Sequence, residues 1–279
     1  MRIFLIRHGE SQANVDADIH QIIPDHDIAL SPLGMEQAQK AGHVLKKYLV
    51  EHPPVLGPAA AAQAASGLIQ NLGALFGQGG QGGMLKQMQD AQSQLLKARL
   101  WNSPYRRARE TAQILGGIIN EHVLDRREDV LLCEQQFGLF DGLGKDLPAT
   151  RFPEEAKCFE HQRKANGKFW ARFPMGESPF DAACRIRQYF GTIKRDEDDK
   201  GISDHIIVCH GTVLKLFTMM WLHRKYEWFA DEPCPGNCGI RLIEKDSNGD
   251  YNANYIYGGH RSGKPWEHKG NKYDPEVIK

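Results

Sequence analysis

Short apolar runs alternate with amphipathic stretches along most of the chain. Three of these runs have the length and the scarcity of polar positions typical of buried strands, namely RIFLI at 2–6, ARLWN at 98–102 and HIIVC at 205–209. Helical patterns follow the runs, at 31–49, 107–119 and 213–222. The first of these begins with Ser31-Pro32, which is typical of a helix N-terminus. The alternation predicts an α/β fold of three layers, α/β/α, around a mostly parallel central sheet.

The C-terminal part of the pattern is different. Residues 239–258 hold two β-rich segments on either side of Asn248-Gly249, which is a strong signal for a tight turn. We therefore expect a hairpin to complete the sheet. Beyond Gly258 the chain is polar and interrupted by Gly and Pro, so an irregular surface tail is expected.

One segment interrupts the alternation. Residues 57–83 carry no charge and are rich in Ala, Gly and Gln, and an amphipathic helical pattern follows them. We interpret 57–97 as an insertion in a single domain that spans 1–279. The preceding helix runs back toward the amino ends of the strands, so the insertion is expected on the face opposite the strand tips. It is either a partner-binding arm, which would allow a homo-oligomer, or a spacer.

Composition excludes several kinds of partner. Hydrophobic residues make up 41% of the 279, which is enough for a sizeable core. Lys plus Arg equals Asp plus Glu at 35 each, so no net field attracts nucleic acid or anionic lipid. No run approaches the roughly 20 apolar residues of a membrane span, and Arg7 interrupts the first run too early for a signal peptide. We expect a cytoplasmic protein without nucleic-acid or membrane partners.

The cysteines do not predict a disulfide framework. They are scattered, and several lie in apolar or helical stretches where a thiol packs as a small hydrophobe; they are Cys133, Cys158, Cys184, Cys209, Cys234 and Cys238. CPGNC at 234–238 has two soft ligands, but no second pair follows it. A tight Pro-Gly turn is the favoured interpretation over a metal site.

Two of the predicted strands end in the same way. RIFLI is followed by Arg7-His8-Gly9, and HIIVC is followed by His210-Gly211. In open α/β sheets ligands bind at the carboxyl ends of strands, and a glycine there lets backbone amides approach an anion. The repetition favours a functional role for both histidines.

A third strand brings more positive charge. LWNSPYRRARETAQIL leaves the strand at 98–102 through a Ser-Pro turn and carries Arg106, Arg107 and Arg109 near the start of the next helix. The planar fork of arginine suits two oxygens of a phosphate, and a helix N-terminus adds to the attraction. Alone this stretch would be interpreted as a solvated basic turn. With the two histidines it indicates an anion site.

Five motifs occur in a characteristic order: LIRHGESQAN, SPYRRARETA, EQQFG, PMGES and VCHGT. In this order they resemble the histidine phosphatase superfamily, also called the phosphoglycerate mutase-like fold, from residue 2 to about 244 apart from the insertion. QRKANGKFWARFPMGES and the Asn-Cys of CPGNC are most similar to the branch described as broad-range acid phosphatases.

The resemblance implies a role for each motif residue. His8 would be the nucleophile that takes the phosphoryl group, and Glu134 would protonate the leaving alcohol and then activate water. Arg7, Arg107 and His210 would hold the phosphoryl oxygens. The anion pocket would be completed by Asn14, Gly211 and Thr212. Clustered arginines would take the place of magnesium, so neither a metal nor a cofactor is implied.

Other glutamates compete for the acid role. Glu10 follows the RHG motif, and Glu177 precedes a predicted helix, where helix capping and orientation of an arginine are the favoured roles. Only the motif position selects Glu134. Nearby cations would tend to ionise it, so it must be sheltered to stay partly protonated, which favours activity at mildly acidic pH.

Residues 139–175 are expected to form a cap that shapes the pocket, because they lie between Glu134 and the GES motif. Basic and aromatic side chains are interleaved in this cap; they are Lys145, Arg151, Phe152, Lys157, Phe159, His161, Arg163, Lys164, Lys168, Phe169, Trp170, Arg172 and Phe173. Such a cap would suit a small phosphorylated metabolite. The other interpretation is an ordinary amphipathic helix pair with solvated lysines.

The sequence around the acid distinguishes two reactions. Phosphoglycerate mutases of this superfamily carry Glu-Arg-His-Tyr-Gly, whereas this chain has Glu-Gln-Gln-Phe-Gly at 134–138. The arginine and tyrosine that would hold a substrate carboxylate are missing, so phosphomonoester hydrolysis is preferred. The alternatives are a mutase or sugar bisphosphatase and, in another class, an inactive module that recognises phosphate. GLGK at 142–145 lacks the spacing of a P-loop.

Overall fold

The computed structural model describes residues 1–53, 97–143 and 147–259. These residues form a six-stranded sheet in the order β3-β2-β4-β1-β5-β6. Its strands are β1 (Arg2–Arg7), β2 (Ala98–Asn102), β3 (Val123–Glu128), β4 (Asp204–Cys209), β5 (Ile240–Lys245) and β6 (Tyr251–Tyr257). The first four strands in sequence are parallel, and β5 and β6 form an antiparallel hairpin beside β1.

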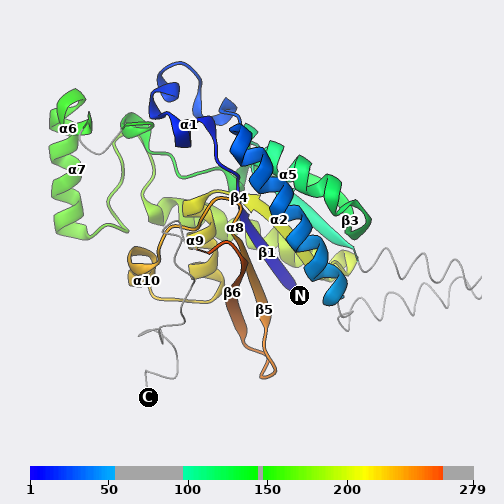
Figure 1. Cartoon of the computed structure of the whole chain (residues 1–279). Coiled ribbons are helices and arrows are strands. Elements are labelled where there is room, and N and C mark those ends of the chain that lie inside the picture. Colours follow the sequence, from blue (N-terminus) through cyan, green and yellow to red (C-terminus); the bar gives the residue numbers. More distant parts are fainter. Residues whose placement is uncertain (54–96, 144–146, 260–279) are drawn as a thin grey trace, which may run out of the picture.

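Helices cover both faces of the sheet, so the three-layer α/β/α prediction is confirmed (Figure 1). One face carries α2 (Pro32–Glu51) and α5 (Arg106–Ile118), and the other carries α8 (Pro179–Lys200), α9 (Gly211–Trp221) and α10 (Tyr226–Asp231). The shorter helices are α1 (Gln12–Val15), α6 (Leu147–Arg151) and α7 (Pro153–Asn166), with 3-10 turns at Ala17–Gln21, Asp25–Asp27, Asn120–His122, Val130–Leu132 and Gly138–Phe140.

The central strand β1 is buried on both faces. Ile3 and Leu5 pack toward α8 and α9, whereas Phe4 and Ile6 pack toward α2 and α5. Alternate side chains of a strand point to opposite faces, so an uninterrupted apolar run is needed to fill both layers. This is why RIFLI is recognisable as a strand from the sequence.

The helix boundaries follow from local capping. Ser31 accepts a hydrogen bond from Gly34 N–H at 3.0 Å, and Pro32 occupies the first turn of α2. At α8, Ser178 and Asp181 form a reciprocal capping box. The six predicted strand and helix spans therefore agree with the structure to within two residues at each end.

The strand β3 was not predicted from the sequence. It reads VLDRRE, and its residues are mostly exposed at one edge of the sheet. Charged side chains on an edge strand hinder pairing with another chain, but they also hide the strand pattern. The predicted hairpin is present as β5 and β6, and Gly249 adopts a φ of +89° in its turn.

The predicted insertion lies almost wholly outside the described residues, as does the tail beyond residue 259. Its described flanks lie at the amino ends of the strands: the His52 carbonyl accepts a hydrogen bond from Arg2 at 2.6 Å, and Ala98 begins β2. The division into a single domain with an insertion stays a prediction, as do oligomeric state and cytoplasmic location. No helix in the described ranges has the length and apolar content of a membrane span.

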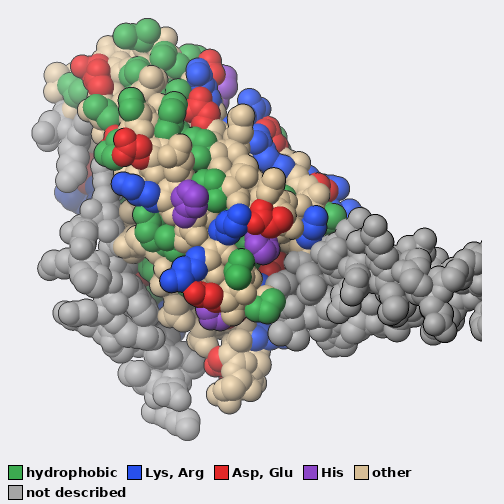
Figure 2. Space-filling model, turned by 45° about the vertical axis from the view of Figure 1, so that its right-hand side comes forward, with side chains coloured by type: hydrophobic (Ala, Val, Ile, Leu, Met, Phe, Trp, Pro, Cys, Tyr) green, Lys and Arg blue, Asp and Glu red, His purple; other side chains and the backbone are tan. Residues whose placement is uncertain are grey.

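The surface and the cysteines agree with the compositional expectations. Lys, Arg, Asp and Glu side chains are interspersed on the face that Figure 2 shows. All six cysteines are free thiols. The CPGNC segment does contain a turn, in which Gly239 N–H donates to the Gly236 carbonyl at 3.0 Å, but its central residues are Asn237 and Cys238 rather than the expected Pro-Gly pair.

We expect the stability of the protein to depend on His205, which is fully buried in β4. Burial lowers its pKa from 6.5 to about 4, so the unfolded chain binds a proton there that the folded chain does not. Stability is therefore lost as the pH falls below 6.5, by about 2 kcal/mol between pH 7 and pH 5. Urea unfolding at both pH values should show this loss in the wild type and a smaller one in His205→Leu. Equal pH dependence of the two proteins would contradict the assignment.

Candidate active site

A cavity of about 970 Å³ opens at the carboxyl ends of β1, β2 and β4. It is lined by six of the residues that the motifs single out: Arg7, His8, Asn14, Arg107, Glu134 and Thr212. The other two, His210 and Gly211, lie directly behind its wall. The His210 ring is 5.2 Å from that of His8, and a Cβ at position 211 would lie 3.6 Å from Arg7 Nε. The structure thus brings all eight residues together.

Strand pairing places the two histidines side by side. The parallel register of β1 and β4 aligns Arg7 with Cys209, so the next residues, His8 and His210, leave the sheet at the same level. His8 N–H donates to the Cys209 carbonyl at 2.9 Å. The two rings then meet edge to face at 62°.

The orientation of the His8 ring is fixed by its own loop. Nδ1 lies 2.7 Å from the Gly9 carbonyl, which can only accept, so Nδ1 carries the proton and Nε2 keeps its lone pair. Burial, together with the charges of Arg107 and Arg7, holds the pKa of His8 well below its ordinary value. The imidazole is therefore neutral at pH 7.

His210 is also buried, and Ser103 orients it. Its Nε2 lies 2.8 Å from Ser103 Oγ, and that hydroxyl oxygen accepts from Tyr105 N–H at 3.3 Å. Nδ1 has no hydrogen-bond partner among the described residues. When the Ser103 hydroxyl donates to Nε2, the ring proton is on Nδ1, which can then donate to an anion. Burial and the nearby arginines lower the pKa of His210 as well.

Arg107 is shared with a carboxylate that the sequence did not predict. Its NH1 group donates to the Asp25 backbone carbonyl at 2.6 Å and to Asp25 Oδ1 at 2.9 Å, and NH2 donates to Oδ2 at 3.1 Å. Three of the five guanidinium donors are thereby engaged. The Nε hydrogen and one NH2 hydrogen, which form a side-on fork, are left for an anion.

Arg7 is held from the opposite side. Its NH1 group donates to the Pro235 carbonyl at 2.7 Å, and the residue is buried. The guanidinium lies near Gly211, where a Cβ would be in ordinary van der Waals contact with Arg7 Nε at 3.6 Å. The CPGNC turn therefore serves to position Arg7.

The side chain of Glu134 lines the cavity and accepts from Gln135 N–H at 3.0 Å. Burial raises its pKa above the ordinary value, and that hydrogen bond together with Arg107 and Arg7 only partly opposes the shift. A carboxyl in this environment stays partly protonated at mildly acidic pH, as expected for a proton donor.

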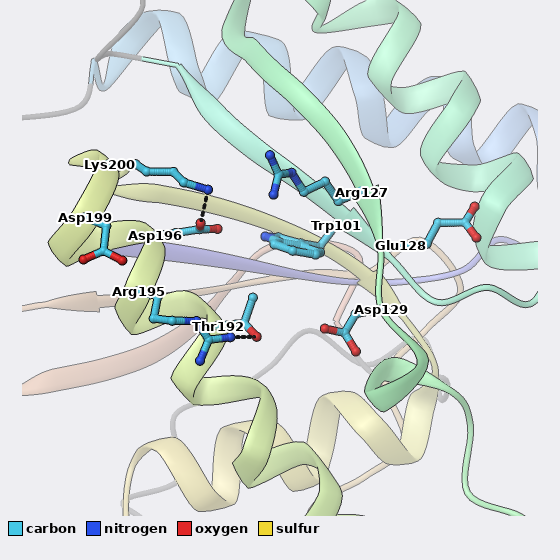
Figure 3. A pocket seen from close by; sticks show the side chains of 9 residues that line it. All are labelled: Trp101, Arg127, Glu128, Asp129, Thr192, Arg195, Asp196, Asp199 and Lys200. Atoms are coloured by element: carbon cyan, nitrogen blue, oxygen red, sulfur yellow. Dashed lines mark hydrogen bonds and ion pairs between the residues drawn. The ribbon is translucent and has the colours of Figure 1, made fainter.

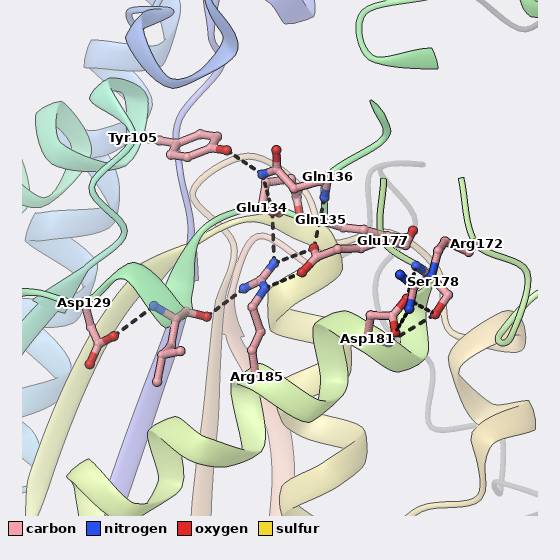
Figure 4. A network of polar contacts seen from close by, with 11 residues as sticks. Tyr105, Asp129, Glu134, Gln135, Gln136, Arg172, Glu177, Ser178, Asp181 and Arg185 are labelled. Atoms are coloured by element: carbon pink, nitrogen blue, oxygen red, sulfur yellow. Dashed lines mark hydrogen bonds and ion pairs between the residues drawn. The ribbon is translucent and has the colours of Figure 1, made fainter. Parts of the chain in front are cut away.

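A network around Arg185 holds the backbone of Glu134 (Figure 4). Arg185 forms a double ion pair with Glu177, with Nε to Oε1 at 2.9 Å and NH2 to Oε2 at 3.0 Å. It also donates to the carbonyls of Leu131 at 2.7 Å and of Glu134 at 3.0 Å. Arg185 thus links α8 to the loop that carries the candidate acid.

The two competing glutamates have structural contacts. Glu177 orients an arginine as predicted, but the helix-capping prediction for it is wrong because the adjacent Ser178 caps α8. Glu10 accepts from the Ser31 hydroxyl at 2.7 Å and does not line the cavity. Neither is a rival for proton transfer at the cavity.

The cap segment 139–175 contributes part of the cavity wall. Phe159 and Phe173 stack at 4.5 Å and line it together with Arg163 and Lys168. Most of the other basic residues predicted there are exposed: Arg151, Lys157, His161, Lys164 and Arg172. Lys145 lies outside the described residues. The cap therefore combines both interpretations, with a pocket-lining aromatic face and a solvated basic face.

One group of potential metal ligands occurs in the described part of the chain. Ligand atoms of His20, Asp25 and Asp141 lie within 4.8 Å of one another at the cavity edge. Asp25 is already paired with Arg107, so its charge is compensated within the protein.

A second hollow, of about 630 Å³, lies between α8 and the end of β3 (Figure 3). Its lining includes Trp101, Arg127, Asp196 and Lys200 and none of the motif residues. Asp196 forms ion pairs with Arg99 of β2 and with Lys200 of its own helix. The pair with Arg99 holds α8 on the sheet, and we regard the hollow as structural.

Comparison with known proteins identifies the family. Residues 3–73 and 84–254 match the family described as histidine phosphatase superfamily (branch 1). The chain belongs to the histidine phosphatase superfamily.

Curated relatives include mutase-like proteins and a phosphatase. The chain is 28% identical over 258 residues to phosphoglycerate mutase-like protein AT74 of Arabidopsis thaliana, covering 90% of this chain and 66% of that protein. It is 24% identical over 303 residues to broad-range acid phosphatase DET1 of Saccharomyces cerevisiae, covering 88% and 86%. The chain thus spans about two thirds of the length of the plant relative.

Solved structures show the same fold. The α-ribazole phosphatase of Shigella flexneri aligns with a TM-score of 0.59 at 18% identity, covering 94% of this chain and 97% of that chain. A mycobacterial glucosyl-3-phosphoglycerate phosphatase in complex with VO3 aligns with a TM-score of 0.58 at 20% identity, covering 91% and 97%.

The motifs do not assign a role to three residues that position the site, namely Ser103, Arg185 and Asp25. Ser103 is the first residue of SPYRRARETA, and its place at the end of a strand could have indicated a role. Arg185 lies seven residues after PMGES. Asp25 lies 82 residues before Arg107, and nothing in the sequence pattern links the two.

The geometry predicts that inorganic phosphate binds in this cavity and that Arg107 contributes to it. Arg107→Gln should weaken phosphate binding by roughly 10- to 100-fold, because hydrogen bonds to a charged group are lost and the Asp25 carboxylate loses its arginine partner. Isothermal titration calorimetry at pH 7 measures the change. Arg109→Gln is the matched control, since that arginine is on the same helix but pairs with Glu128. Equal weakening of phosphate binding in both variants would show that Arg107 does not contact the bound phosphate.

Proposed function

We propose that this protein hydrolyses phosphomonoesters through a phosphohistidine formed on His8. The observation that carries the proposal is the contact of His8 Nδ1 with the Gly9 carbonyl, which leaves the lone pair on Nε2, in a cavity that Arg7 and Arg107 line. Its membership of the histidine phosphatase superfamily supports the same chemistry.

In the first step, His8 Nε2 would attack phosphorus and the ester P–O bond would break. The Nδ1 proton stays hydrogen-bonded to the Gly9 carbonyl, so the ring can attack without losing a proton. Glu134 would give its proton to the departing alkoxide, in keeping with its raised pKa. The products are the free alcohol, phosphohistidine and a Glu134 carboxylate.

In the second step, that carboxylate would take a proton from water as the water attacks phosphorus. The P–N bond breaks, phosphate leaves, and His8 and Glu134 return to their starting states. Arg7, Arg107 and His210 would hold the phosphoryl oxygens, with Asn14, Gly211 and Thr212 around them. Fixed positive charge is the main requirement of phosphoryl transfer, so the proposed reaction uses no metal.

Hydrolysis is favoured over mutase activity by the residues after the acid. Gln135 donates to the Glu177 carbonyl at 2.9 Å and Gln136 donates to the Tyr105 hydroxyl at 2.7 Å, so both amides are used in the network around Glu134. Neither can replace an arginine that binds a substrate carboxylate. The similarity to a broad-range acid phosphatase points the same way.

The covalent intermediate gives the first test of this function. Incubation with a ³²P-labelled phosphomonoester and rapid alkaline quenching should leave acid-labile label on the wild type and none on His8→Asn. His43→Asn, which changes an exposed histidine on α2, should label like the wild type. If neither turnover nor label is found across a substrate panel, the protein is a phosphate-recognising module instead. Transfer of label to a second hydroxyl of the substrate would indicate a mutase.

Glu134→Gln gives the second test. With an alkyl phosphate, kcat should fall by about 100-fold or more because the leaving alkoxide is no longer protonated. With 4-nitrophenyl phosphate, whose leaving group needs no proton, the first step should survive and be seen as a burst. The wild-type kcat for the alkyl ester should decrease as the pH rises through the raised Glu134 pKa, and the variant should lose this dependence. An unchanged pH profile would exclude Glu134 as the acid.

A further inference from the structure

Lys215 is a cation at the cavity that the proposed chemistry does not use. It lies on α9 and lines the same cavity as His8, Arg7 and Arg107. Its ammonium lies 4.4 Å from the centre of the Phe229 ring. No motif of the sequence analysis includes it.

The place of Lys215 relative to the phosphate site follows from helix geometry. Gly211 faces Arg7, and Lys215 is four residues further along the same helix. Residues at this spacing lie on one face of a helix, with their Cβ positions about 5–6 Å apart. The backbone of Lys215 therefore lies about one helical turn from that of Gly211, and its side chain reaches the same cavity.

The charge of Lys215 is not compensated by an ion pair within the described residues. The acid whose charge acts on it, Glu232, is itself paired with Arg241. Lys168 lies on the cavity wall and adds positive charge, while the other basic side chain there, Arg163, pairs with Glu160. Cys234, which also faces Lys215, is a thiol with a free Sγ.

Burial has a measurable consequence for this ammonium. It lowers the pKa of Lys215 to about 8, with Lys168 acting in the same direction. The group is still mostly protonated at pH 7 but partly stripped of water. A cation in this state gains most from an anionic partner, since less hydration is lost on binding.

We infer that Lys215, flanked by Lys168 and supported by Phe229, forms a subsite for a second anionic group of the substrate. The substrate class is a small phosphomonoester whose alcohol carries a carboxylate or a second phosphate. This inference rests on the proposed function for the identity of the phosphate site. It assigns to α9 the recognition that the missing arginine and tyrosine would provide in a mutase.

The test compares three-carbon phosphomonoesters that differ only at the far carbon, namely 3-hydroxypropyl phosphate, 2-carboxyethyl phosphate and propane-1,3-diyl bisphosphate. Binding is measured by calorimetry in His8→Asn, which cannot turn the ligands over. The carboxylate ligand, the bisphosphate ligand or both should bind more tightly than the hydroxyl ligand. The ligand that binds more tightly identifies the second group as a carboxylate or a phosphate. Adding Lys215→Met should weaken binding of the preferred ligand by about 10- to 30-fold and binding of the hydroxyl ligand by less than about 2-fold.

The controls separate this subsite from folding and from the proposed reaction. Lys215→Arg should keep most of the preference, and Lys40→Met, on an exposed face of α2, should keep all of it. Equal affinity for all three ligands, or a preference that survives Lys215→Met, would overturn the inference. If the wild type binds the charged ligand more tightly but forms no phosphohistidine, the proposed function is wrong and the subsite is retained.

Discussion

The site depends on the parallel pairing of β1 with β4. This pairing aligns Arg7 with Cys209 and so delivers His8 and His210 to one point at the carboxyl edge of the sheet. Both strands are central and apolar on both faces, so a slip in register would disturb two core layers at once. The hydrophobic core thereby fixes the distance between two catalytic candidates that are 202 residues apart in the sequence.

The same burial that stabilises the sheet also sets the protonation of the site. It lowers the pKa values of His8 and His210 and raises that of Glu134, which leaves two neutral imidazoles and a carboxyl that can hold a proton. The arginines cannot lose their protons, so positive charge stays in place while the other groups change state. Asp25 compensates part of that charge and engages the NH1 and NH2 groups of Arg107.

The sequence was informative wherever periodicity or a motif was strong. The apolar run of β1 and the Ser-Pro start of α2 predicted their elements closely, and the motif order predicted the family and all eight residues that meet at the cavity. Prediction from the sequence failed where tertiary contacts determine the structure. The edge strand β3 has a charged pattern because exposure selects its side chains, and Asp25 meets Arg107 only after two separate segments fold.

We expect the leaving alcohol and the phosphoryl group to contact different parts of the fold. Groups that would bind the phosphoryl moiety follow the strand ends, where the backbone is rigid, whereas the far side of the cavity is built by the cap and by the second turn of α9. The cap has few buried residues: Phe140, Phe169 and Ala171 are buried, but α7 has none. Substitutions in α7 therefore disturb the core little, which leaves this wall free to vary while the phosphate site stays the same. Lys215 is different, because its helix packs on the sheet through Leu214 and Phe217. A charge fixed in that way can define a distance from the phosphate, which a mobile surface lysine cannot do.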